Sequence, residues 1–318
     1  MSVGIPRQSS SGWQIWVHAL RLRTLPLSVA GIFLANVLAY LSEDFSWSIA
    51  ILSLSTAMLL QIVANLANDY GDGVNQMDGV DRQGPLRATA SGLVKPRVML
   101  LVVGLACVLT ILSGLLLLWS AWRINDPFNW GGWIGLGGLS VLAALAYTIG
   151  QRPYGYRGLG DLAVLFFFGY VAVMGTLMLH TNLWSQVWQL PVICAASAIG
   201  LWSVAVLNLN NMRDIESDSR HGKITVAVKL GLHKAQQYQR ILLSFASLAW
   251  LGFLYTLWSL SHDDKLLIPM VLCGLLLIRH LRQNWLQATA AMFTQELQRL
   301  SRDVLVQVLV FAIIVLFF

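Results

Sequence analysis

The chain has 318 residues, of which 57% are hydrophobic and only 11% are charged. Soluble domains carry about 25% charged residues, so this composition excludes an ordinary soluble globular domain and indicates a lipid environment. The formal net charge is +6, but the basic residues are spread between apolar blocks. We therefore expect basic loops at a membrane surface and no binding of nucleic acid.

Residues 1–12 are polar and rich in serine, and we expect them to be disordered. Beyond them, nine apolar blocks approach the length of about 20 residues that a membrane-spanning helix needs. The blocks are residues 25–41, 49–68, 98–120, 131–149, 160–179, 190–210, 241–260, 266–281 and 304–318. No long stretch of soluble character interrupts them. Residues 1–318 are therefore predicted to form one all-α, polytopic membrane domain with about nine transmembrane helices around a central cavity.

The distribution of positive charge supports this topology. If the N-terminus is cytoplasmic, then 19 of the 21 basic residues fall in cytoplasmic segments, and only Arg123 and Lys265 fall outside. One missed or added helix would scramble this alternation. The pattern predicts an N-terminus inside and a C-terminus outside, with two long cytoplasmic loops at residues 69–97 and 211–240.

Carboxylate and amide side chains gather where each of these two loops begins. The first cluster is Asn65, Asn68, Asp69, Asp72, Asp78 and Asp81. The second cluster is Asn210, Asn211, Asp214 and Asp218, in which Asn210, Asp214 and Asp218 share one helical stripe. Aspartate at a helix C-terminus opposes the helix dipole, so capping explains these clusters poorly, although it could explain any one aspartate.

The chemistry of the two clusters points to a hard cation. Neighbouring carboxylates repel one another, and a bound cation removes that conflict. Oxygen ligands without histidine or cysteine select an ion such as Mg²⁺, which usually binds substrate phosphates as well. The basic residues Arg82, Arg87, Lys223 and Arg152 lie in the same or neighbouring loops and suit an anionic ligand. Each of them alone is equally well explained as a topology anchor.

The motifs resemble those of the UbiA-type intramembrane prenyltransferases, from about Arg21 to the end of the chain. The family carries two Asp-rich motifs, which correspond here to N-D-Y-G-D at 68–72 and N-N-M-R-D-I-E-S-D at 210–218. The chain looks most similar to the branch that prenylates 1,4-dihydroxy-2-naphthoate in menaquinone biosynthesis. That similarity is carried by L-R-L-R-T-L-P-L-S at 20–28, D-R-Q-G-P-L-R at 81–87 and R-P-Y-G-Y-R-G-L-G-D at 152–161.

The resemblance implies Mg²⁺-dependent transfer of a polyprenyl group from its diphosphate to the naphthoate, with loss of CO₂. It also implies a bacterial cytoplasmic (inner) membrane location, with the active site toward the cytoplasm. The implied metal ligands are Asp69, Asp72, Asp214 and Asp218, with Asp78 or Asp81 in place of an absent third acid. The implied catalytic residues are Asp72, Asp214, Arg152 and Tyr147. The implied substrate-binding residues are Asn65, Asn68, Arg82, Arg87, Asn210, Asn211, Lys223 and Tyr154.

The sequence departs from the family pattern at three positions. Gln76 stands where the first motif usually ends in aspartate, Asn210 stands where the second usually begins with it, and Gln151 replaces a lysine. Which basic residue contacts the diphosphate therefore stays open. Two other functions also stay open, namely prenyl transfer to another acceptor such as 4-hydroxybenzoate and membrane transport. Transporters place ionisable residues near mid-membrane, whereas the acids here cluster at helix ends, which favours an enzyme.

Overall fold

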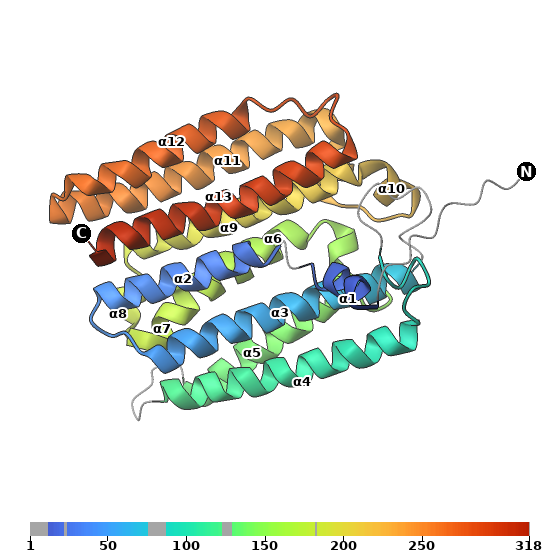
Figure 1. Cartoon of the computed structure of the whole chain (residues 1–318), viewed down its shortest axis with the longest axis horizontal. Helices are drawn as coiled ribbons and strands as arrows, with labels where there is room; N and C mark the ends of the chain where they lie inside the picture. The colour runs from blue at the N-terminus through green and yellow to red at the C-terminus, as the bar shows by residue number, and fades with distance from the viewer. Residues whose placement is uncertain (1–11, 22–23, 76–86, 123–128, 182, 318) are drawn as a thin grey trace, which may run out of the picture.

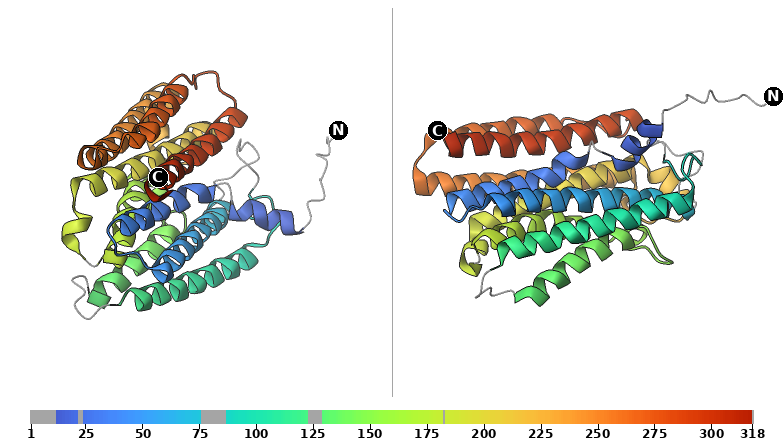
Figure 2. Two further views of the ribbon diagram at one scale, coloured as in Figure 1. Left: turned by 60° about the vertical axis from the view of Figure 1, so that its left-hand side comes forward. Right: turned by 60° about the horizontal axis from the view of Figure 1, so that its bottom comes forward.

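The computed structural model describes residues 12–21, 24–75, 87–122, 129–181 and 183–317 of the chain. Every regular element in these ranges is helical, which confirms the predicted all-α class. The longer helices lie side by side along the long axis of the molecule (Figure 1), and two further views show the same bundle (Figure 2). The long helices are α2 (Leu25–Leu41), α3 (Trp47–Val74), α4 (Pro96–Ala121), α5 (Asn129–Ala146), α9 (Leu190–Arg213), α11 (Val226–Ser261), α12 (Leu267–Leu281) and α13 (Ala290–Phe317).

Shorter elements complete the bundle. One continuous helical segment consists of α6 (Gly160–Val164), the π-helix η3 (Leu165–Gly175) and α7 (Thr176–Thr181). The remaining elements are α1 (Gly12–Leu20), η2 (Tyr154–Arg157), α8 (Trp184–Val187), α10 (Ile215–Arg220) and η4 (Asp264–Leu266).

Each predicted apolar block lies mainly within a helix of the described residues, but the helices differ in how well they suit a membrane. Six segments are long and apolar enough to cross one, namely α3, α4, Gly160–Thr181, α9, α11 and α13. A seventh results if α1 and α2 form one broken span. Helices α5 and α12 are shorter, with 18 and 15 residues. The chain is thus a multi-pass membrane protein, and the count of nine spans stays a prediction.

Helix α9 lies at the centre of the bundle. It packs against α11, η3 and α13, and small side chains allow these close approaches. A Cβ atom on Gly169 of η3 would lie 2.7 Å from the carbonyl oxygen of Ala196, so only glycine permits this helix crossing. On its other side, Trp202 of α9 packs against Trp250 of α11, with ring centroids 5.7 Å apart.

Both acidic clusters lie at the same end of the bundle. Helices α3 and α9 finish at this end, and α10 follows α9 there, while α13 finishes at the opposite end (Figure 1). We call the end at which α3 and α9 finish the loop end. The turn between α5 and α6, which contains η2, lies at the loop end as well (Figure 1).

Candidate active site

Asp72, in the last turns of α3, lies buried between two partners. Its carboxylate pairs with Arg87, with Oδ2 2.5 Å from Nη2, and Oδ1 accepts a hydrogen bond of 2.5 Å from the Tyr156 hydroxyl. Burial, and then the charge of Asp72, raise the pKa of Tyr156, so its hydroxyl stays protonated and donates. Only 1% of Asp72 is exposed. The Asp72 carboxylate therefore binds both the first loop, through Arg87, and η2, through Tyr156.

Asp69, one helical turn earlier, organises the first loop. Its two carboxylate oxygens accept hydrogen bonds from the backbone N–H groups of Ala88 and Thr89, at 2.9 and 2.8 Å. A carboxylate that receives two backbone donors fixes the chain locally, and here it fixes the segment that carries Arg87. This geometry gives Asp69 a role in folding the loop, and its role as a metal ligand stays a prediction.

Asp214 follows the last residue of α9 and forms a two-point contact with its neighbour in the chain. Arg213 Nε and Nη2 donate to the two oxygens of Asp214 at 2.8 and 2.7 Å. The same guanidinium donates to Asn210 Oδ1 at 2.8 Å and to Thr294 Oγ1 of α13 at 3.3 Å. Arg213 thus anchors the second motif to α13. The sequence reasoning did not include Arg213 as a site residue, although it lies inside the second motif.

Asp218, in α10, is the third buried carboxylate. Its Oδ1 lies 3.3 Å from the ammonium group of Lys223, while its Oδ2 is buried and receives no hydrogen bond from the described residues. Burial raises the pKa of Asp218; Lys223 opposes this, and the charges of Asp214 and Asp72 add to it. The carboxylates of both motifs thus act electrostatically on Asp218, in keeping with their placement at the same end of the bundle.

The asparagines differ in what they contact. Asn68 Oδ1 accepts a hydrogen bond of 3.1 Å from Thr148 in the α5–α6 turn. Asn65 is buried and donates to the carbonyl oxygen of Leu20 at 2.9 Å, which ties α3 to the end of α1. Asn210 contacts Arg213 as described above, and Asn211 is buried. Asn65 thus holds two helices together, whereas Asn68 and Asn210 lie next to site residues.

Two tyrosines predicted to lie near the substrate form an aromatic pair. The rings of Tyr147 and Tyr154 meet edge to face with centroids 5.3 Å apart. Tyr147 is half-buried in the α5–α6 turn, and a Cβ atom on Gly160 at the start of α6 would lie 3.1 Å from its hydroxyl. Tyr154 instead donates its hydroxyl to the carbonyl oxygen of Ala143 in α5, at 2.9 Å.

Four predicted site residues are not joined to this cluster in the described structure. Arg152 is exposed on the turn before η2, and no described hydrogen bond or ion pair connects it to the acids. Asp78, Asp81 and Arg82 lie outside the described residues. Among the described residues, Arg87, Arg213 and Lys223 form the ion pairs with these acids.

The donor set suits a hard divalent cation. Among the described residues, no three His, Cys, Asp or Glu side chains are grouped so that they could hold a metal ion as they stand. Asp72, Asp214 and Asp218 instead each pair with a cationic side chain of the chain itself. All available ligands are oxygen atoms, and Asp218 offers one buried oxygen without a donor. Mg²⁺ prefers this chemistry.

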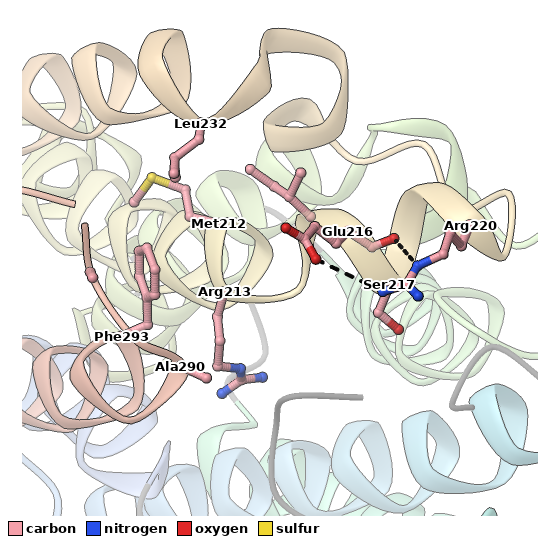
Figure 3. Close-up of a pocket in the computed structure, with 10 residues that line it drawn as sticks. Met212, Arg213, Glu216, Ser217, Arg220, Leu232, Ala290 and Phe293 are labelled. Carbon is pink, nitrogen blue, oxygen red and sulfur yellow. Dashed lines mark hydrogen bonds and ion pairs between the residues drawn. The ribbon is translucent and has the colours of Figure 1, made fainter. Parts of the chain in front are cut away.

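A separate cavity lies beside the second motif. Its volume is about 150 Å³, and its walls come from α9, α10, α11, α13 and the segment before α13 (Figure 3). The Glu216 and Arg220 side chains form an exposed pair on one side, while the Arg213 side chain extends away from them toward Ala290 (Figure 3). None of the three buried carboxylates lines this cavity.

Comparisons with known proteins agree with the resemblance seen in the sequence. Residues 27–298 match the model of the UbiA prenyltransferase family. The chain is 45% identical to the 1,4-dihydroxy-2-naphthoate octaprenyltransferase of Escherichia coli, with 80% of each chain covered. It is 41% identical to the enzyme of the same name from Haemophilus influenzae, with 76% of this chain and 77% of that one covered.

Solved structures show the same fold. A UbiA homolog from Aeropyrum pernix superposes with a TM-score of 0.61 at 17% identity, covering 93% of this chain and 98% of that one. A UbiA homolog from Archaeoglobus fulgidus, bound to DMAPP and Mg²⁺, gives a TM-score of 0.54 at 13% identity, covering 92% and 99%. The family match extends over most of the chain and includes both acidic motifs. This chain therefore belongs to the UbiA prenyltransferase family.

Proposed function

We propose that this enzyme transfers a polyprenyl group from polyprenyl diphosphate to 1,4-dihydroxy-2-naphthoate in a Mg²⁺-dependent reaction that releases CO₂. The observation that carries the proposal is the presence of three buried carboxylates, each paired with a cation, at one end of an apolar bundle. Relatives at 45% and 41% identity that are named for this acceptor support its choice. Residues 1–318 act as one domain in this proposal.

Asp72, Asp214 and Asp218 would hold Mg²⁺, with Asn68 and Asn211 beside them. When bound, Mg²⁺ neutralises the diphosphate and makes it a better leaving group. Arg87, Arg213 and Lys223, which pair with these carboxylates in the structure, would supply positive charge for the anionic diphosphate. Arginine and lysine both bind phosphate oxygens well.

The apolar helices that adjoin the loop end accept the isoprenoid chain and exclude water from the reacting carbon. The half-buried ring of Tyr147 lies in the α5–α6 turn at the loop end, where its face would stabilise positive charge that develops on the allylic group. The naphthoate ring carbon that bears the carboxylate then forms the new C–C bond, and CO₂ leaves. The site lies on the cytoplasmic side of a bacterial inner membrane in this proposal.

The acceptor is tested by competition. Purified enzyme receives one prenyl diphosphate, Mg²⁺ and equal amounts of carboxyl-labelled 1,4-dihydroxy-2-naphthoate and 4-hydroxybenzoate. We expect labelled CO₂ and the prenylated, decarboxylated naphthalene product, with little prenylated hydroxybenzoate. Prenylated hydroxybenzoate as the main product would move the enzyme to another branch of the family.

Removal of divalent metal is expected to abolish activity reversibly. Chelation by EDTA should stop product formation, and added Mg²⁺ should restore it, because oxygen ligands and diphosphate both bind this ion. Product formation is measured before chelation, after it and after re-addition, with Ca²⁺ as the control ion of equal charge and larger radius. Full activity in a metal-free preparation would contradict the mechanism.

The orientation in the membrane is tested by accessibility. In a background without the native cysteines, Ala90→Cys and Lys265→Cys each place one thiol at an exposed position, in the first loop and in η4 respectively. Positive charge concentrates on the cytoplasmic side. An impermeant maleimide added outside intact cells should therefore label the thiol at 265 and leave the thiol at 90 unlabelled. The reverse pattern would invert the topology.

A further inference from the structure

Tyr156 makes three contacts that reach two separate segments of the loop end, namely α3 and the segment between α10 and α11. It lies in η2 with 8% of its surface exposed. Its hydroxyl donates to Asp72 Oδ1 at 2.5 Å, its carbonyl oxygen accepts from the N–H of Ile224 at 2.9 Å, and its ring lies 5.7 Å from the Lys223 ammonium group. The sequence reasoning did not include Tyr156 among the site residues.

These contacts join segments that are far apart in the chain. Tyr156 and Asp72 are 84 positions apart, and Ile224 belongs to the segment between α10 and α11. Lys223 in turn pairs with Asp218, with 3.3 Å between Nζ and Oδ1. One side chain therefore reaches the first motif through its hydroxyl and the second motif through its ring.

We propose that Tyr156 is a positioning residue that sets the separation of the two acidic motifs before the metal and the diphosphate bind. The inference rests on the proposed function, in which Asp72 and Asp218 become metal ligands. A tyrosine has only two rotatable side-chain bonds, so a buried ring held at three points defines its neighbours closely. Ligands that are already placed lose less conformational freedom when the ion arrives.

The hydroxyl contact of Tyr156 with Asp72 and its ring contact with Lys223 can be removed separately. Tyr156→Phe removes the hydrogen bond to Asp72 and keeps the ring that faces Lys223. Tyr156→Leu removes the hydroxyl and the aromatic face together. Tyr170→Phe is the matched control. Tyr170 lies in η3, away from the loop end, and its hydroxyl is 3.0 Å from Ser197 Oγ, so the variant also deletes one hydrogen-bonded tyrosine hydroxyl.

Metal binding is measured without turnover. Mn²⁺ replaces Mg²⁺ as a paramagnetic probe, and inorganic diphosphate supplies the anion. We expect Tyr156→Phe to weaken Mn²⁺ binding about tenfold, which corresponds to about 1.4 kcal/mol, and Tyr156→Leu to weaken it further. The Mg²⁺ concentration for half-maximal prenyl transfer should rise by the same factor, while Tyr170→Phe should match wild type in both measurements.

The contact between the Tyr156 ring and Lys223 is tested by proteolysis in the absence of metal. Trypsin cuts after lysine and arginine, and the Lys223 side chain is 10% exposed whereas that of Arg220 is 56% exposed. Cleavage after Arg220 therefore serves as an internal reference. We expect Tyr156→Leu to speed cleavage after Lys223 at least about tenfold relative to Arg220, because the loop opens locally, and Tyr156→Phe to leave the ratio unchanged.

Wild-type Mn²⁺ affinity in Tyr156→Phe would overturn the role of the hydroxyl, even if the Leu variant fails to fold. An unchanged cleavage ratio in a folded Tyr156→Leu variant would overturn the role of the ring. Failure of the proposed function looks different, because wild-type enzyme would then form no product with naphthoate while its Mn²⁺ binding and cleavage ratio stay measurable.

Discussion

Replacement of Asp72 or Asp214 by asparagine is expected to lower kcat/KM at least about a hundredfold, which corresponds to about 2.7 kcal/mol of transition-state stabilisation. Both carboxylates are buried, and each belongs to one of the two motifs that meet at the loop end. Asparagine keeps the size of the side chain and removes the charge that a metal ion needs. Prenyl transfer at saturating Mg²⁺ measures the loss.

Glu216→Gln is the matched control for this prediction. Glu216 lies two positions from Asp214 in the same motif, but its side chain is 78% exposed and faces Arg220. Its loss of charge should change kcat/KM less than about twofold, because exposed ion pairs contribute little. Wild-type activity in Asp72→Asn or Asp214→Asn would exclude these residues as metal ligands.

A second variant separates catalysis from folding. Asp72→Asn leaves Arg87 buried without its anion, and loss of one partner of a buried pair costs about 3–5 kcal/mol of stability. The double variant Asp72→Asn with Arg87→Gln removes both charges. Its thermal stability should recover toward wild type while its activity stays low. Recovery of activity together with stability would mean that Asp72 serves only to neutralise Arg87.

Substitution of Gly71 by alanine is expected to disrupt the site strongly, although alanine favours helices more than glycine does. A Cβ atom at position 71 would lie 2.6 Å from the carbonyl oxygen of Thr148 and 2.8 Å from its carbonyl carbon and Cβ. These atoms belong to the backbone or its first side-chain carbon, so they cannot rotate away. The α5–α6 turn would have to move from α3, which would break the Thr148 hydrogen bond of 2.9 Å to Ala67.

Overpacking of this kind costs about 1–3 kcal/mol, and it displaces Asn68 and Asp72 on either side of the glycine. We expect a lower melting temperature in detergent and at least about a tenfold loss of prenyl transfer. Gly104→Ala in α4 is the control, because no atom lies within 4 Å of its Cβ position. Its stability should equal or exceed that of wild type. A Gly71→Ala enzyme with full activity would show that the α5–α6 turn can move away from α3 without disturbing the site.

The sequence predicts the elements of this protein better than their contacts. Apolar block length and the alternation of positive charge locate the helices, because both follow from the bilayer itself. The π-helical stretch Leu165–Gly175 could not be predicted from amino-acid composition, because its hydrogen-bond pattern depends on how the helix packs against α9. The exact number of spans is likewise open for α5 and α12, whose lengths are marginal.

The site shows the same division. The aspartates of both motifs could be identified from the sequence. Carboxylates that cluster at the C-terminal ends of predicted helices repel one another and oppose the helix dipole, so they indicate a bound cation. Arg87 and Lys223 were predicted as site residues, but the pairing of Arg87 with Asp72 is a long-range contact that appears only in the fold. Arg213 lies inside the second motif and pairs with its neighbour Asp214, yet the sequence pattern drew attention to Arg152 as the basic residue. Tyr156 was recognisable only as part of R-P-Y-G-Y, where nothing distinguishes it from Tyr154. Their hydroxyls point to Asp72 and to Ala143 respectively, and that difference appears only in three dimensions.

Each of the three buried carboxylates already has a cationic side chain of the chain itself as its counter-ion. Binding of a metal ion and a diphosphate would therefore exchange these counter-ions for new ones. A metal ion bound by Asp72 or Asp214 would compete with Arg87 or Arg213 for the same carboxylate oxygens, and a displaced guanidinium would need a new anion. A diphosphate supplies that anion, whereas a metal ion alone does not. Free Mg²⁺ and free diphosphate are thus each poorer ligands than the two together. Under the proposed function, this coupling would let the protein bind a metal–diphosphate complex in preference to either ion alone.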